Sequence, residues 1–247
     1  PYRKEIELVG GLGLDEDPET IGAHARRLKN EGFRTFKIKI GQRDRKKDIE
    51  RVRAVREAVG EDAAIRVDGN ASYSFVEARE ALNALAKYNI ADAEQPLARS
   101  DLKSLAELRR VVGIPIAAQE SISTPEEALL VLQENAADLV KIKLTHIGGF
   151  QRALQVADVV GAGGLPVVVG QGSACTTILS AAEMHLHASL RNAQPTGEMT
   201  GFLRLGEQGI FSPIEVKSAK DILQDKAGLG IEVDGENPDI LYAAMYK

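Results

Sequence analysis

Short apolar stretches alternate with amphipathic stretches along most of this chain, and the regular distance between them restricts the fold more than any other feature. A strand followed by a helix at such a distance is a βα unit, and a series of these units forms a parallel sheet. The residues that end successive strands lie 24 to 29 positions apart, at Lys39, Asp68, Glu94, Gln119, Lys143 and Gly170. The predicted strands are 5–9, 35–40, 64–67, 90–93, 116–118, 139–143, 167–169 and, with the weakest pattern, 193–197.

Helix-start signals support the amphipathic stretches as helices. Ser74 and Glu77 form a capping-box pattern, and Thr124 stands before Pro125 as an N-cap. The predicted helices are 18–30, 44–59, 74–88, 102–111, 124–134, 150–160 and 174–190.

Eight strands and seven helices in one chain favour an α/β fold of the TIM type, a (β/α)8 barrel and more specifically a (β/α)7β barrel. A doubly wound sheet is the alternative, but it requires a glycine-rich turn after the first strand. The stretch 10–14 matches this turn only weakly, and acidic residues follow it at 15–17. We expect a catalytic barrel over 1–206 and a C-terminal tail over 207–247, with a last short helix over 238–245.

Composition narrows the class of partner. The chain has 247 residues and a net charge of -5 with both signs evenly mixed, which argues against nucleic-acid and anionic membrane surfaces. No apolar run approaches the roughly 20 residues of a membrane helix. Cys175 is the only cysteine and the chain starts without an apolar signal region, so we expect a cytoplasmic protein that acts on a small substrate.

Polar residues collect at the predicted carboxyl ends of the strands. Alternation places Lys37 and Lys39 on one strand face. Such a pair often protects an exposed sheet edge. In a barrel, however, the strand ends converge on one mouth, where the active sites of this architecture lie. The other residues at these ends are Asp68 with Asn70, Glu94, Gln119 with Glu120, and Lys143.

This combination of side chains suggests a reaction. Oxygen ligands from successive strands suit Mg²⁺, and lysines on either side of a substrate can carry protons. The pattern indicates removal of a proton next to a carboxylate, with a bound ion stabilising the enediolate that results.

The ordered motifs resemble the enolase superfamily, in its muconate lactonizing enzyme subgroup, over residues 5–206. They are Lys-Ile-Lys at 37–39, Asp-Gly-Asn at 68–70, Glu-Gln-Pro at 94–96, Gln-Glu-Ser at 119–121 and Ile-Lys-Leu-Thr-His-Ile-Gly-Gly at 142–149.

The resemblance implies a role for each matching residue. Asp68 and Glu94 would bind Mg²⁺, or Mn²⁺ as an alternative, while Lys39 and Lys143 would act as acid and base with Lys37 as electrostatic support. Lys141 competes with Lys143 for its role, and the family's third ligand, an Asp, is replaced by Gln119, so Glu120 is the alternative. Asn70 would be a nearby polar contact and Glu198 would match the acid after the last strand. Apart from the resemblance, His146 and Gln171 are further candidates for substrate contacts. A phosphate site at 170–173 is a further alternative.

The resemblance also implies partners and an activity. Family members carry an N-terminal capping domain, so we expect the tail to pack on a cap, a capping-domain polypeptide as a partner, and a homo-oligomer. The expected enzyme is a racemase, epimerase or cycloisomerase acting on an amino acid derivative, a dipeptide or a related carboxylate. An o-succinylbenzoate synthase-type dehydratase and a non-catalytic barrel that serves as a binding module are the alternatives.

Overall fold

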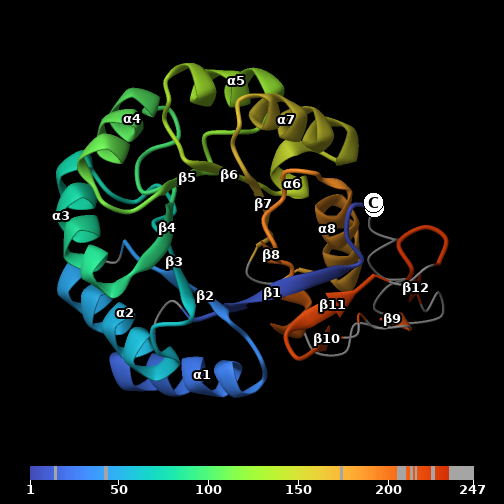
Figure 1. The fold of residues 1–247 in the computed structure, drawn as a ribbon, viewed down its shortest axis with the longest axis horizontal. Coiled ribbons are helices and arrows are strands. Elements are labelled where there is room, and N and C mark those ends of the chain that lie inside the picture. The colour runs from blue at the N-terminus through green and yellow to red at the C-terminus, as the bar shows by residue number, and fades with distance from the viewer. Residues whose placement is uncertain are drawn as a thin grey trace, which may run out of the picture.

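Eight parallel strands form a closed ring with helices around it (Figure 1). The computed structural model describes residues 1–13, 16–41, 44–172, 175–204, 210–211, 214, 216–223 and 226–233. Strands β1 to β7 pair in sequence order, β8 pairs with β1, and bridges from Val167 to Ala193 and from Gly170 to Glu198 join β7 to the β8 segment. The strands are β1 (Glu5–Gly11), β2 (Thr35–Lys39), β3 (Ala64–Asp68), β4 (Ile90–Glu94), β5 (Ile116–Ala118), β6 (Leu139–Ile142), β7 (Val167–Val169) and β8 (Thr196–Gly197).

Helices follow the first seven strands, which confirms the (β/α)7β barrel and excludes the doubly wound sheet. The predicted caps are present: Ser74 and Glu77 form a capping box, and the Thr124 side chain accepts a hydrogen bond from the Glu127 amide. The helices are α1 (Pro18–Asn30), α2 (Arg45–Val59), α3 (Phe75–Leu85) with η1 (Ala86–Tyr88), α4 (Leu102–Val111), α5 (Pro125–Gln133), α6 (Leu144–Ile147), α7 (Phe150–Ala162) and α8 (Thr177–Ser189). The single turn α6 was not predicted, because four residues are too short to show a helical period.

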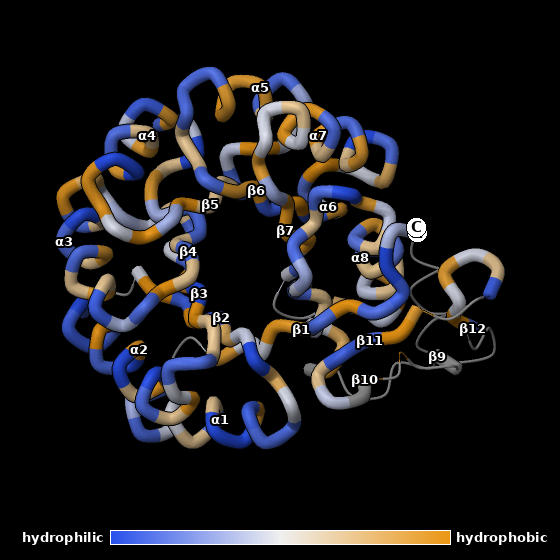
Figure 2. The backbone as a smooth tube through the Cα atoms, viewed as in Figure 1, coloured by the Kyte–Doolittle hydropathy of each residue, from blue (hydrophilic) through white to orange (hydrophobic). Residues whose placement is uncertain are grey.

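The alternation within β2 separates the apolar core from the barrel interior. Phe36 and Ile38 are fully buried in the main apolar cluster, while Lys37 and Lys39 point the other way, into the ring. Figure 2 shows apolar segments recurring in the strands and in the surrounding helices. Since β2 pairs with β1 on one side and β3 on the other, the interpretation of its lysines as edge protection is wrong.

Part of the predicted tail joins the barrel. After η2 (Gly201–Arg204), β10 (Val216–Lys217) and β11 (Lys220–Ile222) form an antiparallel pair, and β11 pairs with Glu5–Glu7 of β1 (Figure 1). Strands β9 (Ile210–Phe211) and β12 (Glu232–Val233) pair with each other. The predicted helix over 238–245 lies outside the described residues, and packing of the tail on a cap stays a prediction. None of the described helices is long and apolar enough to cross a membrane.

The buried side chain of Arg51 on α2 ties together the loops that follow β1 and β2. Its guanidinium donates hydrogen bonds to the carbonyl oxygens of Gly13, Glu16 and Lys39, and it contacts Asp48 Oδ1 at 3.3 Å. Asp48 Oδ2 in turn accepts from the Gly41 amide at 2.9 Å. One fully buried cation thus fixes the backbone on which Lys39 is mounted.

Replacing Arg51 by Lys should therefore destabilise the barrel by about 2–4 kcal/mol, because an ammonium group cannot supply the planar fork that reaches all three carbonyl groups. Urea unfolding measures the change. Arg53→Lys, on the exposed face of the same helix, is the matched control and should stay within about 0.5 kcal/mol of wild type. Equal effects of the two substitutions would contradict the role assigned to Arg51.

Candidate active site

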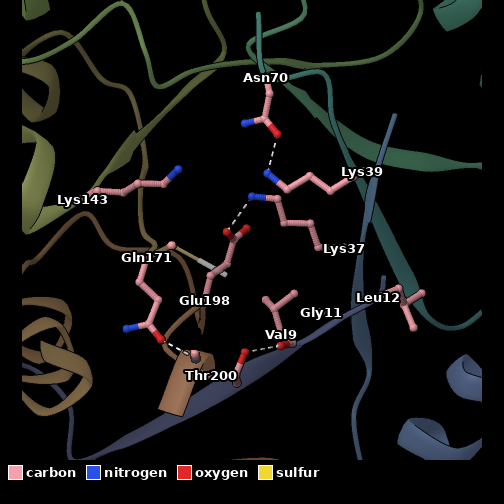
Figure 3. A pocket seen from close by; sticks show the side chains of 12 residues that line it. Val9, Gly11, Leu12, Lys37, Lys39, Asn70, Lys143, Gln171, Glu198 and Thr200 are labelled. Carbon is pink, nitrogen blue, oxygen red and sulfur yellow. Dashed lines mark hydrogen bonds and ion pairs between the residues drawn. The ribbon is translucent and has the colours of Figure 1, made fainter. Parts of the chain in front are cut away.

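A cavity of about 480 Å³ opens at the carboxyl end of the barrel (Figure 3). Its wall combines ammonium groups, one carboxylate, amides and a small apolar part. The lining residues are Val9, Gly11, Leu12, Lys37, Lys39, Asn70, Lys143, Gln171, Gly172, Glu198, Thr200 and Gly201. Strands distant in the sequence thus deliver the predicted residues to one place.

Lys37 lies at the centre of a cluster of carboxylates. Its Nζ is 2.9 Å from Asp68 Oδ2, 2.5 Å from Glu94 Oε2 and 2.9 Å from Glu198 Oε2. Burial alone would lower the pKa of Lys37, but Glu198, Glu94 and Asp68 raise it well above the ordinary value. Lys37 is therefore a permanent cation that neutralises the acids around it.

Lys39 and Lys143 reach into the cavity from opposite walls (Figure 3). Lys39 Nζ lies 2.9 Å from Asp68 Oδ2 and also contacts Asn70 Oδ1. Lys143 follows β6 directly, and its Nζ donates to Gln119 Oε1 at 2.7 Å. A substrate between them would present one face to each amine.

The environment of Lys143 favours its neutral form. Burial is the largest cause that lowers the pKa of Lys143, and the cations Lys37 and Lys141 lower it further, against the opposing effect of Glu94. An amine with a lowered pKa is a better proton acceptor near neutral pH than an ordinary lysine. Within one site, the pKa of Lys37 is thus raised and the pKa of Lys143 is lowered.

A second layer of charges lies beneath the cavity, and of its residues the sequence pointed only to Lys141, as the alternative to Lys143. Lys141 is buried, contacts Glu94 Oε2 and donates to Glu198 Oε1 at 2.6 Å. Arg66 pairs with Asp92 at 3.0 Å. These residues stand two positions before Lys143, Asp68 and Glu94 on the same strands, so strand alternation could have found them. Lys143 lines the cavity and Lys141 does not, which favours Lys143 as the proton carrier.

Oxygen atoms for a cation are present, but not as three carboxylates. Among the described residues, no group of three His, Cys, Asp or Glu side chains is placed to hold a metal ion. Asp68, Glu94 and the Gln119 amide supply hard oxygen donors at neighbouring strand ends, and Glu94 Oε1 is buried without a hydrogen-bond partner. Such a carboxylate oxygen, without a hydrogen bond and 3.9 Å from Lys143 Nζ, fits a hard cation.

Gln95 holds the backbone at Gln119, the neutral candidate for the third metal ligand. Gln95 has a φ of 33°, and its side-chain oxygen accepts hydrogen bonds from the amides of Gln119 and Ser121 at 2.9 and 3.2 Å. Glu120 Oε1 accepts from Asn70 Nδ2 at 3.1 Å, so Glu120 would have to leave Asn70 to serve as a ligand. Gln119 Oε1 likewise accepts from Lys143 Nζ at 2.7 Å, so either side chain would exchange a hydrogen bond for the ion.

Three of the four predicted substrate contacts line the cavity. Asn70, Glu198 and Gln171 line the cavity, whereas His146 on α6 is not among its lining residues and shares a 2.9 Å hydrogen bond with Ser123 Oγ. Of the loop considered for phosphate, Ser173 lies outside the described residues.

Glu183 on α8 is a buried carboxylate behind the cavity wall that sequence reasoning missed. It accepts from Gln171 Nε2 at 2.7 Å and from the Leu144 amide at 3.3 Å, next to Lys143. Burial raises the pKa of Glu183 to about 7, although the hydrogen bonds from Gln171 and Leu144 oppose this shift. An apolar helix face gave no sign of this contact, because it joins residues far apart in the sequence.

Removing this acid should change the pH dependence of stability. The folded state keeps the Glu183 proton up to about pH 7, while the unfolded chain loses it near pH 4.5. Stability is therefore lost as pH rises, and between about pH 5 and pH 8 the wild type should lose up to about 3 kcal/mol more than Glu183→Gln. Urea unfolding at several pH values measures this difference, and Glu107→Gln on the exposed face of α4 should keep the wild-type slope. A wild-type slope in Glu183→Gln would contradict the assignment.

Comparison with known proteins bears on this arrangement. The profile of the enolase C-terminal domain-like family matches residues 20–237. The chain is 34% identical to a hydrophobic dipeptide epimerase from Enterococcus faecalis over 93% of its own length and 64% of the relative. It is 32% identical to muconate cycloisomerase 1-1 of Acinetobacter lwoffii, over 95% of its own length and 61% of that protein.

A solved structure shows the same likeness in three dimensions. A substrate-liganded complex of the L-Ala-D/L-Glu epimerase from Bacillus subtilis superposes with a TM-score of 0.89 at 32% identity, over 94% of this chain and 64% of that one. The chain thus spans less than two thirds of the length of these relatives. The resemblance inferred from the strand-end motifs is confirmed, and the chain belongs to the enolase C-terminal domain-like family.

Proposed function

We propose that this barrel catalyses magnesium-dependent removal of a proton from the carbon next to a substrate carboxylate. The observation that carries the proposal is the placement of Lys39 and Lys143 on opposite walls of one cavity, above the carboxylates Asp68 and Glu94. Two amines on opposite faces of one carbon permit removal of a proton by one and its return by the other, which inverts the centre.

Each lysine has a defined part in such an inversion. Neutral Lys143 accepts the proton on one face, and the ammonium group of Lys39 returns a proton on the other; for the opposite enantiomer the roles exchange. Asp68 and Asn70 hold the Lys39 amine, and Gln119 holds that of Lys143, so both point at the same space. Fixed positions of this kind remove much of the entropic cost of the proton transfers.

The remaining residues prepare the site for developing negative charge. Asp68, Glu94 and Gln119 would hold Mg²⁺, which when bound supplies positive charge next to the substrate carboxylate. Lys37 stays protonated among its three acids and adds a fixed cation beside the reacting group. The second layer of Lys141 and Arg66 keeps Glu94 and Glu198 in place.

Names of relatives support this class of reaction. They include epimerases acting on dipeptides, an N-succinyl-L-Arg/Lys racemase from Bacillus cereus and several muconate cycloisomerases. We therefore propose racemisation or epimerisation of an amino acid derivative or dipeptide, with cycloisomerisation or an o-succinylbenzoate synthase-type dehydration as other uses of the same residues. A capping-domain partner and a homo-oligomer remain predictions.

A non-catalytic barrel that binds a ligand is the second candidate, and the neutral Gln119 among the proposed metal ligands is the observation that favours it. Substitution of each proton carrier tests the first candidate against it. Lys143→Ala and Lys39→Ala should each lower solvent deuterium exchange at the α-carbon by about 100-fold or more, each from a different enantiomer of the substrate. Proton NMR in D2O follows the exchange. Lys103→Ala on exposed α4 should exchange like wild type, and unaltered exchange in either test variant would remove that lysine from the mechanism.

Affinity for Mg²⁺ tests the third ligand. Gln119→Asp restores a carboxylate at the end of β5, so its dissociation constant for Mg²⁺ should fall by about ten-fold or more, since charge attracts the ion more strongly than an amide dipole. Gln119→Asn, with the same side-chain length as Asp but no charge, is the matched control and should not gain affinity. Calorimetric titration provides the measurement. If wild type and Gln119→Asp bind Mg²⁺ equally well, the side chain at position 119 is not a ligand.

A further inference from the structure

Each of the two proposed proton carriers lies on a stretch of backbone that a buried charged side chain holds. For Lys39 that side chain is Arg51, which binds the Lys39 carbonyl group and the loop after β1. On the opposite wall the corresponding side chain is that of Glu183, which is fully buried on α8. Glu183 does not line the cavity, so any effect on the reaction must pass through its neighbours.

One oxygen of Glu183 holds the backbone directly after Lys143. Lys143 precedes the single helical turn α6, and its own side chain makes no cap hydrogen bond. The first amides of a helix have no partner within it, and Glu183 Oε1 accepts a hydrogen bond from the Leu144 amide at 3.3 Å. The Lys143 carbonyl oxygen is fixed as well, because it accepts from the amides of His146 and Ile147 at 3.1 Å.

The other oxygen of Glu183 holds the segments after the next two strands through Gln171, which follows β7. Gln171 Nε2 donates to Glu183 Oε2 at 2.7 Å, and Gln171 Oε1 accepts from Ser180 Oγ and from the amide of Gly201, the first residue of η2. A Cβ at Gly201 would lie 2.7 Å from Gln171 Oε1, so this close contact depends on a glycine. Figure 3 shows Gln171 on the same side of the cavity as Lys143.

The hydrogen bonds around Glu183 require an acceptor on each of its two oxygens. The Leu144 amide and Gln171 Nε2 are both neutral donors, and a carboxylate accepts from both. An amide side chain offers one acceptor and one donor, so in either orientation its nitrogen would face another donor. A buried donor without an acceptor is unfavourable, and the backbone around it would have to move.

We infer that Glu183 is a positioning residue for Lys143. Its two oxygens fix the backbone after β6 and, through Gln171, the segments after β7 and β8, and these contacts determine where the Lys143 amine lies in the cavity. The role of Lys143 as a proton carrier rests on the proposed function, whereas the contacts of Glu183 do not.

Exchanging the donor and the acceptor between positions 171 and 183 tests the inference. Glu183→Gln sets one amide nitrogen against a donor, and Gln171→Glu sets one carboxylate against another. The double variant, with both substitutions, restores a donor and an acceptor, because the new amide can donate to the new carboxylate and still accept from the Leu144 amide. Glu107→Gln on the exposed face of α4 is the control. If Glu183→Gln does not fold, Glu183→Asp, which keeps the charge but is one methylene shorter, replaces it.

Crystal structures of wild type and variants at about pH 8 give the first measurement. Glu183 is mostly ionised at that pH, since burial raises its pKa only to about 7. In each single variant Lys143 Nζ should leave Gln119 Oε1, from which it lies 2.7 Å in the wild type, and in the double variant it should return. An unchanged position of Lys143 in both single variants would overturn the inference.

Exchange at the two faces of the substrate gives the second measurement. The probes are L- and D-N-succinylarginine, and L-alanyl-L-glutamate with L-alanyl-D-glutamate, each in D2O with excess Mg²⁺. Lys143→Ala and Lys39→Ala identify which isomer of a pair depends on which lysine. Glu183→Gln should slow exchange of the Lys143-dependent isomer by about ten-fold or more and that of the Lys39-dependent isomer by less than about three-fold, because a small misplacement of one reacting group is costly. The double variant should regain most of the loss.

The outcomes separate this inference from the proposed function. Equal loss of exchange from both isomers in Glu183→Gln would indicate general structural damage and would overturn the inference alone. If wild type exchanges neither pair, or if Lys143→Ala exchanges both isomers like wild type, the failure lies with the proposed function. The crystal structures then decide by themselves whether Glu183 positions Lys143.

Discussion

Mutual neutralisation of buried charges is the constraint on which the rest of the structure depends. Lysine and arginine side chains enter the barrel interior from β2, β3 and β6, and they meet acids from β3, β4 and the end of β8. A single buried charge without partners would be costly, and removing one member of such a network leaves the others uncompensated. The buried charged side chains are therefore stable only together. Their ion pairs also fix the positions of the groups at the mouth of the barrel.

Within this set, position decides the chemistry of each amine. Lys37 touches three carboxylates and is held in its charged form, whereas Lys143 contacts the neutral Gln119 and lies 3.9 Å from the nearest carboxylate oxygen of Glu94. The same type of side chain is thus held in its charged form in one place and shifted toward its neutral form in another. The neutral amide of Gln119 contributes to this difference, because it leaves Lys143 less compensated than a carboxylate in the same place would.

The sequence was sufficient for the barrel and for the mouth residues, because both follow from local periodicity. The spacing of the strands predicts a closed barrel. Because the strand ends meet at one opening, the residues that end the strands are predicted to lie together there, namely Lys39, Asp68, Glu94 and Lys143. Arg66 and Asp92 were missed although the same alternation points to them, and Lys141 was considered only as the alternative to Lys143, since a charged residue within an apolar strand has no local sign of its partner. Glu183 and the pairing of β11 with β1 depend on contacts between distant segments, and no local pattern contains them.

Strand β1 pairs with three other strands: β2 at its C-terminal half, β8 at its middle and β11 at its N-terminal half. Its C-terminal half supplies Val9 and Gly11 to the cavity, and the amide of Leu8, between the two halves, donates to the Ala219 carbonyl at 2.8 Å. One strand therefore spans the distance from the C-terminal strands to the cavity. By thermodynamic reciprocity, if the attachment of β11 to β1 favoured a ligand in the cavity, that ligand would strengthen the attachment by the same free energy. The segment after the barrel would then contribute to binding affinity, although the described part of it lines no wall of the cavity.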